Sequence, residues 1–240
     1  MNKHLALLAP IVAAAFLASC ATAPVASPPT AASTQPAAPE PTLTPAPPTE
    51  PVATTAAVSP GGVLRLVVAP EGNEARFRVR EQLVGVDLPS DAVGTTASVS
   101  GAIVIQPDGQ IIAGESSFVV DLTTLRTDSS RRDGYIQRNT LETATYPEAV
   151  FVPAAAAGLP SPLPTSGTIA FQLSGDLTVH GVTRPVTWEV KAQVEGQTLR
   201  GTATTNITFT DFGMTLPRVG PVLSVEDLIA LELDFALTLE

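Results

Sequence analysis

The strongest constraint on the fold is a strict alternation of apolar and polar residues. Residues 229–240 show it most clearly, because every second side chain from Ile229 to Leu239 is apolar while Glu232 and Asp234 lie on the opposite face. Side chains of a β-strand point alternately to its two faces, so a period of two predicts a strand with one buried face. The same pattern recurs in residues 76–80, 98–105, 168–179, 186–195 and 202–209. The chain is therefore expected to form half-buried antiparallel strands.

Turn residues separate these segments, at Pro107-Asp108-Gly109, His180-Gly181 and Glu195-Gly196-Gln197. They favour hairpin connections because they supply a fixed or a positive φ. One short helix is expected over residues 128–142, with Asp128 or Ser129 as its cap. About seven or eight long strands and one helix cannot cover an open sheet, so closure into a barrel or a sandwich is expected to remove the exposed edges.

Residues 1–20, MNKHLALLAPIVAAAFLASC, combine Lys3, an apolar run from Leu5 to Leu17 and small residues before Cys20. This is the pattern of an export signal peptide. The ending Leu-Ala-Ser-Cys matches the bacterial lipobox, which predicts cleavage before Cys20 and lipid attachment to its thiol. Cys20 is the only cysteine, so neither a disulfide nor a cysteine metal site is expected. A permanent transmembrane anchor is disfavoured, because a spanning helix needs roughly 20 apolar residues and this run is shorter.

Residues 21–62 are dominated by Pro, Ala and Thr, and Glu40 and Glu50 are their only charges. Such a segment cannot build a core, so a disordered, Pro-rich linker of up to ~3 Å per residue is expected. The predicted organisation is a signal peptide at 1–20, a linker at 21–62 and one folded domain at 63–240.

The lipid anchor predicts a place in the cell envelope. Ala21 follows the lipobox cysteine where an aspartate would be the usual inner-membrane retention signal. A two-membrane host is therefore expected to place the protein on the periplasmic side of its outer membrane, and a one-membrane host on the outer face of the cell membrane.

Composition excludes some partners. The net charge is −10, and the basic residues are scattered, so nucleic acid is not an expected partner. A membrane-spanning β-barrel is disfavoured because an aromatic content of 5% cannot supply two interfacial girdles, and because the polar faces suit water.

Several motifs resemble those of the YceI-like proteins. GDLTVHGVTRPVTWEV at residues 175–190 resembles the hairpin signature of that family, and VVDLTTLRTDSSRRDGYIQ (119–137), YPEAVF (146–151) and FTDFGM (209–214) follow the same order and spacing. The resemblance implies an all-β fold, an extended antiparallel lipocalin-like β-barrel with one short helix. It also implies an elongated apolar lumen that in some members holds a polyisoprenoid or similar long-chain lipid. The sequence departs from the family at Glu81, where histidine is usual, and at residues 139–142, which replace two phenylalanines.

The apolar strand faces supply the expected lumen wall. Candidate ligand-binding residues are Phe77, Val79, Ile103, Ile105, Phe118, Ile136, Phe151, Phe171, Leu173, Trp188, Phe209, Phe212, Met214, Leu231, Leu233 and Phe235. The expected function is binding or sequestering a long-chain apolar lipid of polyisoprenoid type. The alternative is a structural or protein-interaction barrel whose own side chains fill the interior. The sequence also leaves open whether the protein forms a homodimer.

No catalytic site is expected. His180 is the only histidine left after signal removal, and neither a nucleophile motif nor a set of metal ligands accompanies it. Its place in a turn predicts a bond to backbone groups. A charged group around the helix could contact a lipid head group or act as acid and base, but a solvated helix face is the preferred interpretation. Its members are Asp128, Arg131, Arg132, Asp133 and Arg138.

Overall fold

The computed structural model describes residues 62–218 and 222–240. The predictions for the signal peptide, for Cys20 and for the linker up to residue 61 lie outside these residues. No helix among the described residues is both long and apolar enough to cross a membrane. The strands are β1 (Leu64–Val68), β2 (Glu74–Leu83), β3 (Ser90–Thr96), β4 (Val99–Ile105), β5 (Ser117–Asp121), β6 (Arg126–Thr127), β7 (Glu148–Ala157), β8 (Ser166–Val179), β9 (Val182–Glu195), β10 (Thr198–Thr208) and β11 (Val222–Leu239).

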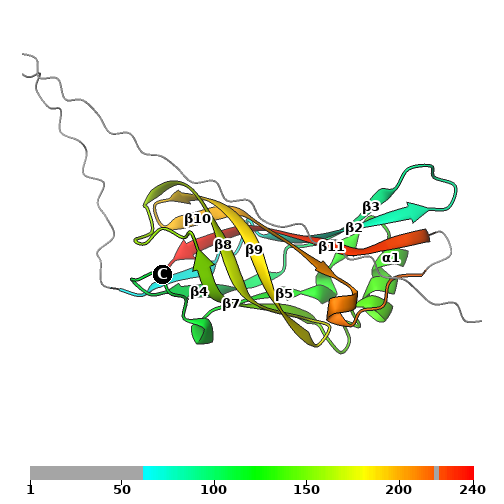
Figure 1. Cartoon of the computed structure of the whole chain (residues 1–240), viewed down its shortest axis with the longest axis horizontal. Coiled ribbons are helices and arrows are strands. Elements are labelled where there is room, and N and C mark those ends of the chain that lie inside the picture. Colours follow the sequence, from blue (N-terminus) through cyan, green and yellow to red (C-terminus); the bar gives the residue numbers. More distant parts are fainter. Residues whose placement is uncertain (1–61, 219–221) are drawn as a thin grey trace, which may run out of the picture. The chain divides into compact units, whose positions relative to one another are not determined.

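The sheet closes on itself. Strands β1, β4, β5, β7, β8, β9, β10 and β11 are neighbours in that order, and β1 pairs with both β4 and β11. All these pairings are antiparallel, and β8 and β9 pair along their full length (Figure 1). The predicted all-β antiparallel barrel with one short helix is confirmed, and its closed ring has eight strands.

Three further strands extend the wall beyond this ring. β2 pairs with the first part of β11, β3 pairs with β2, and β6 pairs with β3. β1 and β2 therefore occupy successive stretches of one edge of β11, because β1 pairs with Leu237–Leu239 and β2 with Val222–Asp234. On the far side of these two strands, β4 pairs with β1 and β3 pairs with β2. β4 and β3 therefore also follow one another along the wall.

Asn73 bridges the break between β1 and β2. Its side-chain oxygen accepts a hydrogen bond from the backbone N–H of Ala236 at 2.9 Å, and its amide donates to the carbonyl oxygen of Ala69 at 2.7 Å. Ala236 is completely buried, and Asn73 is only 9% exposed. A buried N–H without a partner costs free energy, so this side chain replaces the missing ladder bond.

We expect the substitution Asn73→Ala to lower the free energy of unfolding by about 2 kcal/mol, because it leaves buried backbone groups unpaired. Asn73→Asp keeps the acceptor for Ala236 but buries a charge and turns a carboxylate oxygen toward the carbonyl oxygen of Ala69, so its loss at neutral pH should be at least as large. Urea unfolding of the full chain measures both losses. Equal stability of Asn73→Ala and the wild type would show that the bridge is not needed.

The helix begins and ends within the expected span of residues 128–142, but its pitch changes. α1 (Ser130–Tyr135) is an α-helix whose cap is Ser129, which accepts a hydrogen bond from the N–H of Arg132. It continues as a π-helix, η3 (Ile136–Thr140). The N–H of Leu141 bonds to the carbonyl oxygen of Ile136, five residues earlier, which is the wider π-type spacing.

The three predicted turns lie between the expected strands. His180 and Gly181 join β8 to β9 with φ values of 52° and 73°, which is the pair of positive values that a two-residue hairpin turn requires. Gly109 and Gly196 also have positive φ, in the turns after β4 and β9. Short 3-10 turns complete the fold, namely η1 (Ala113–Glu115), η2 (Leu122–Thr124) and η4 (Thr210–Phe212).

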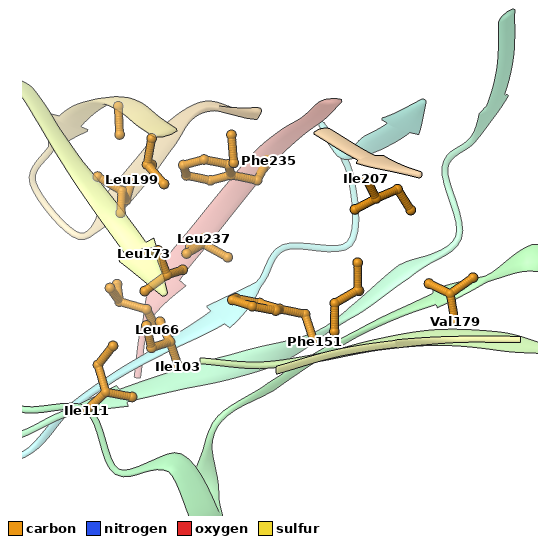
Figure 2. Close-up of a cluster of buried hydrophobic side chains, with 14 of the residues drawn as sticks. Leu66, Ile103, Ile111, Phe151, Leu173, Val179, Leu199, Ile207, Phe235 and Leu237 are labelled. Atoms are coloured by element: carbon orange, nitrogen blue, oxygen red, sulfur yellow. The ribbon is translucent and has the colours of Figure 1, made fainter. Parts of the chain in front are cut away.

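The alternation seen in the sequence sorts side chains between the interior and the surface. On β9, Val190, Ala192 and Val194 are buried, while the intervening Lys191 and Gln193 are exposed. Side chains from different walls, such as Leu66, Phe151 and Ile207, point from their strands toward the interior (Figure 2). Burial of these apolar faces is the main stabilising term for a closed sheet of this kind.

Candidate ligand-binding cavity

The barrel encloses a cavity of about 670 Å³. This volume is within the range of small-molecule sites in proteins. Every strand of the closed ring contributes apolar side chains to its wall, including Leu66 of β1, Leu199 of β10 and Leu237 of β11. Close packing of side chains therefore does not fill this interior.

Most of the predicted lumen residues lie on the cavity wall. They are Phe77, Val79, Ile103, Phe118, Ile136, Phe151, Phe171, Leu173, Trp188, Phe209, Met214, Leu231, Leu233 and Phe235. Leu177, Val179, Ile207 and Ile229 also line the cavity without having been predicted. The same alternation identifies them, because they share the inward face of their strands.

Ile105 and Phe212 do not line the cavity, contrary to expectation. Ile105 is 5% exposed, lies at the end of β4 and forms an isolated bridge with Ile111, so it packs where the barrel wall ends. Phe212 is 1% exposed and belongs to η4, which packs against β9 and β10. Both residues belong to the solid part of the core. Alternation indicates a face of a strand and not a position along the barrel, as for Ile105, and it does not apply to Phe212 in η4.

The helix brings polar side chains to the cavity. Ser129, Arg131, Arg132, Tyr135, Arg138 and Thr140 all lie on its wall, together with Glu81 from β2. The expectation that the arginines form only a solvated helix face is therefore corrected. Arg131 and Arg138 are exposed, in contrast to the rest of the described wall residues, and so they mark a place where the wall meets solvent.

Glu81 and Arg132 form a partly buried ion pair beside this wall. Arg132 Nη2 lies 2.8 Å from Glu81 Oε1, and the two side chains are 26% and 8% exposed. Arg132 also reaches Asp128 Oδ1 at 2.5 Å. The pair joins the helix to β2.

Replacing Arg132 by methionine should destabilise the barrel by about 3 kcal/mol, because the buried carboxylate of Glu81 is left without its charged partner. A second variant that also carries Glu81→Leu should recover much of the loss, since it removes the unpaired charge. Thermal and urea unfolding of the single and double variants would give the coupling free energy. Additive losses would contradict a direct interaction between the two side chains.

Charged wall residues away from the helix are paired. Arg76 donates to Glu74 and Asp234 at 2.7 and 2.6 Å and also pairs with Glu232, which joins β2 to β11. The hydrogen bond to Glu74 and the charge of Asp234 raise the pKa of Arg76 above its usual value. Burial opposes ionisation of Asp234, but hydrogen bonds from Thr202 and Arg76 outweigh it and lower the pKa of Asp234.

His180 lies outside the cavity wall, in the β8–β9 turn. Its Nδ1 lies 3.4 Å from the carbonyl oxygen of Phe212, which agrees with the predicted contact to backbone. Its ring packs edge-on against Tyr146, and its Nε2 lies 3.6 Å from Glu142 Oε1. Within the described residues, no group of three or more His, Cys, Asp or Glu side chains is placed to hold a metal ion.

The arrangement of strands and motifs can now be compared with known proteins. Residues 66–237 match the model of the YceI-like domain. The chain belongs to the YceI-like family. A UPF0312 protein of Pseudomonas putida (strain GB-1) is 35% identical over 111 residues, which cover 42% of this chain and 54% of that relative. One from Pseudomonas syringae pv. syringae (strain B728a) is 34% identical over 124 residues, covering 47% and 59%. The chain thus spans little more than half the length of these relatives.

Two solved structures share the YceI-like fold with this chain. One is a polyisoprenoid binding domain from Saccharophagus degradans implicated in plant cell wall breakdown, with a TM-score of 0.57 and 17% identity over 75% of this chain and 100% of that chain. The other is Burkholderia cenocepacia BcnA, with a TM-score of 0.50 and 17% identity over 68% of this chain and 95% of that chain. At this identity the likeness establishes the barrel architecture.

Proposed function

We propose that this protein binds a long-chain apolar lipid, such as a polyisoprenoid, in the lumen of its barrel. The observation that carries the proposal is the cavity itself, whose wall is formed by apolar side chains from every strand of the ring. Each methylene group transferred from water into such a cavity contributes about 0.8 kcal/mol. About fifteen of them would supply about 12 kcal/mol, which leaves about 8 kcal/mol and micromolar affinity after an association cost of about 4 kcal/mol.

The family supports this proposal. The chain is a YceI-like protein, and the structurally similar domain from Saccharophagus degradans binds a polyisoprenoid. A slender, flexible chain has the shape that the lumen of an eight-stranded barrel can admit. The protein would carry or sequester such a lipid, and no chemical step is needed for either role.

We also propose that the barrel is attached to the cell envelope through lipid on Cys20. The lipobox supports this attachment, and the Pro-rich segment after it supports a tether. The two or three acyl chains of a lipoprotein would make attachment effectively permanent. The variant Cys20→Ser should move the protein from the membrane fraction to the soluble fraction, and an unchanged distribution would contradict the anchor.

Lipid extraction tests the lumen proposal directly. The full chain, purified from the envelope of its own host, should release a long-chain lipid that mass spectrometry identifies in about equimolar amount. The variant Trp188→Glu places a charge on the cavity wall and should lose the lipid. The matched variant Thr187→Glu changes the adjacent exposed residue and should retain it.

Circular dichroism of both variants checks that the barrel still folds. Wild-type protein that contains no lipid and binds none when prenyl alcohols are added would contradict the proposed function. It would favour a structural or protein-interaction barrel instead.

A further inference from the structure

Several polar residues of the cavity wall are gathered at the helix, and two of them, Arg131 and Arg138, carry charges that no carboxylate balances in the part of the chain that the structure describes. Arg132 pairs with Glu81 and Asp128, whereas neither Arg131 nor Arg138 has a carboxylate within 4.0 Å among the described residues. The nearby Asp133 accepts hydrogen bonds from the backbone and side chain of Thr127, both at 2.7 Å. The carboxylates of this region are therefore engaged elsewhere, although the chain as a whole has a net charge of −10.

The two free arginines share one side of the helical segment. Arg131, Tyr135 and Arg138 all border the cavity, and Arg131 and Tyr135, four positions apart in α1, lie on the same helix face. The guanidinium of Arg138 folds back over Gly134, because a Cβ added there would lie 3.0 Å from both of its terminal nitrogens. The charge of Arg138 therefore lies over Gly134, which is three positions after Arg131.

Thr140 provides a second, independent observation. Thr140 is 4% exposed and lies on the cavity wall, and its hydroxyl has no hydrogen-bond partner within residues 62–218 and 222–240. A buried hydroxyl without a partner costs free energy, and most such groups in proteins are paired. An oxygen atom of a bound ligand would accept a hydrogen bond from this hydroxyl.

We infer that the helix end of the cavity holds an anionic head group, so that the ligand is an amphipathic chain ending in a phosphate or a carboxylate. The inference rests on the proposed lumen binding and adds the chemistry of the head. Arg131 and Arg138 supply positive charge, Thr140 supplies a hydroxyl donor, and the apolar strands receive the tail. Guanidinium groups match the geometry of phosphate and carboxylate oxygens.

A pair of lipids with the same tail tests this inference in the full chain. Geranylgeranyl monophosphate and geranylgeraniol differ only in the head, and Trp188, the only tryptophan, lies on the cavity wall and reports binding by its fluorescence. The monophosphate should bind about tenfold more tightly than the alcohol, since charge-assisted hydrogen bonds are stronger than neutral ones. Inorganic phosphate alone should not bind at the same concentration, because it has no tail.

Charge-removing variants locate the head. The double variant Arg131→Gln/Arg138→Gln should abolish the preference for the monophosphate, so that the two lipids bind with similar affinity. Thr140→Val should weaken monophosphate binding about threefold to tenfold. The matched double variant Arg78→Gln/Arg126→Gln removes two exposed arginines that are absent from the cavity wall, and it should keep the preference.

The failures are distinguishable. Equal binding of the alcohol and the monophosphate, or an unaltered preference in the Arg131→Gln/Arg138→Gln variant, would overturn the head-group assignment and leave lumen binding intact. Binding of inorganic phosphate as tight as that of the monophosphate would also overturn it, because the site would then bind free anions. Failure of both lipids to bind would overturn the proposed function together with this inference.

Discussion

Replacing Ala203 by phenylalanine should lower the affinity for lipid by about a hundredfold, because an aromatic ring would fill the middle of the lumen. Ala203 is buried, lies on the cavity wall, and is paired with Val190 and Leu233, which line it too. Excluding about four methylene groups of the ligand would remove about 3 kcal/mol of binding free energy. The measurement is a titration with geranylgeraniol followed by tryptophan fluorescence.

The neighbouring residue provides the control for this experiment. Thr204 is on the same strand, but its side chain is exposed on the opposite face. Thr204→Phe should bind lipid like the wild type, and both variants should unfold at urea concentrations close to that of the wild type. If the affinity of Ala203→Phe for lipid is unchanged, lipid does not occupy the part of the lumen beside residue 203.

The largest loss of stability should come from Phe212→Ala. Phe212 is 1% exposed and among the largest fully buried side chains, and its backbone carbonyl contacts the ring of His180 at the β8–β9 turn. Removing a buried aromatic ring leaves a void that neighbouring side chains fill only in part. We expect the free energy of unfolding to fall by about 4 kcal/mol in urea titrations.

Phe171→Ala is the informative comparison for Phe212→Ala. Phe171 is half-buried on β8 and borders the cavity, so one side of its ring already lacks packing partners. Its removal should cost about half as much, because fewer van der Waals contacts are lost. Equal losses for the two variants, measured without ligand, would contradict a hollow interior.

Much of the fold could be predicted because one physical rule governs most of the chain. The alternation in residues 168–179 and 229–239 specifies strands with one buried face, and turn residues such as Gly181 and Gly196 specify where they reverse. The residues on the inward face of these strands then make up most of the cavity wall. Whether the interior is hollow depends on the spacing between walls, and this spacing is not encoded in any single strand.

Other features depend on contacts between distant residues and could not be predicted. The role of Asn73 requires Ala236 to lie beside it, which only the paired strands reveal. The direction of Arg131 and Arg138 depends on how the helical segment lies against the barrel, and the change to π-type spacing at Ile136 disturbs the ordinary helical period. The charged residues could be recognised in the sequence, but the side they face could not.

The closing pair of strands brings the two ends of residues 62–240 to one rim of the barrel. Leu66 lies opposite Leu239, and the N–H of Glu240 bonds to the carbonyl oxygen of Arg65, so both ends of the folded region share one rim. Arg132 instead contacts Glu81, which pairs with Val225 near the start of β11, and α1 therefore lies toward the other rim (Figure 1). A fluorescent protein fused after Glu240 would sit at the rim away from the helix, and it should therefore leave binding of geranylgeraniol unchanged.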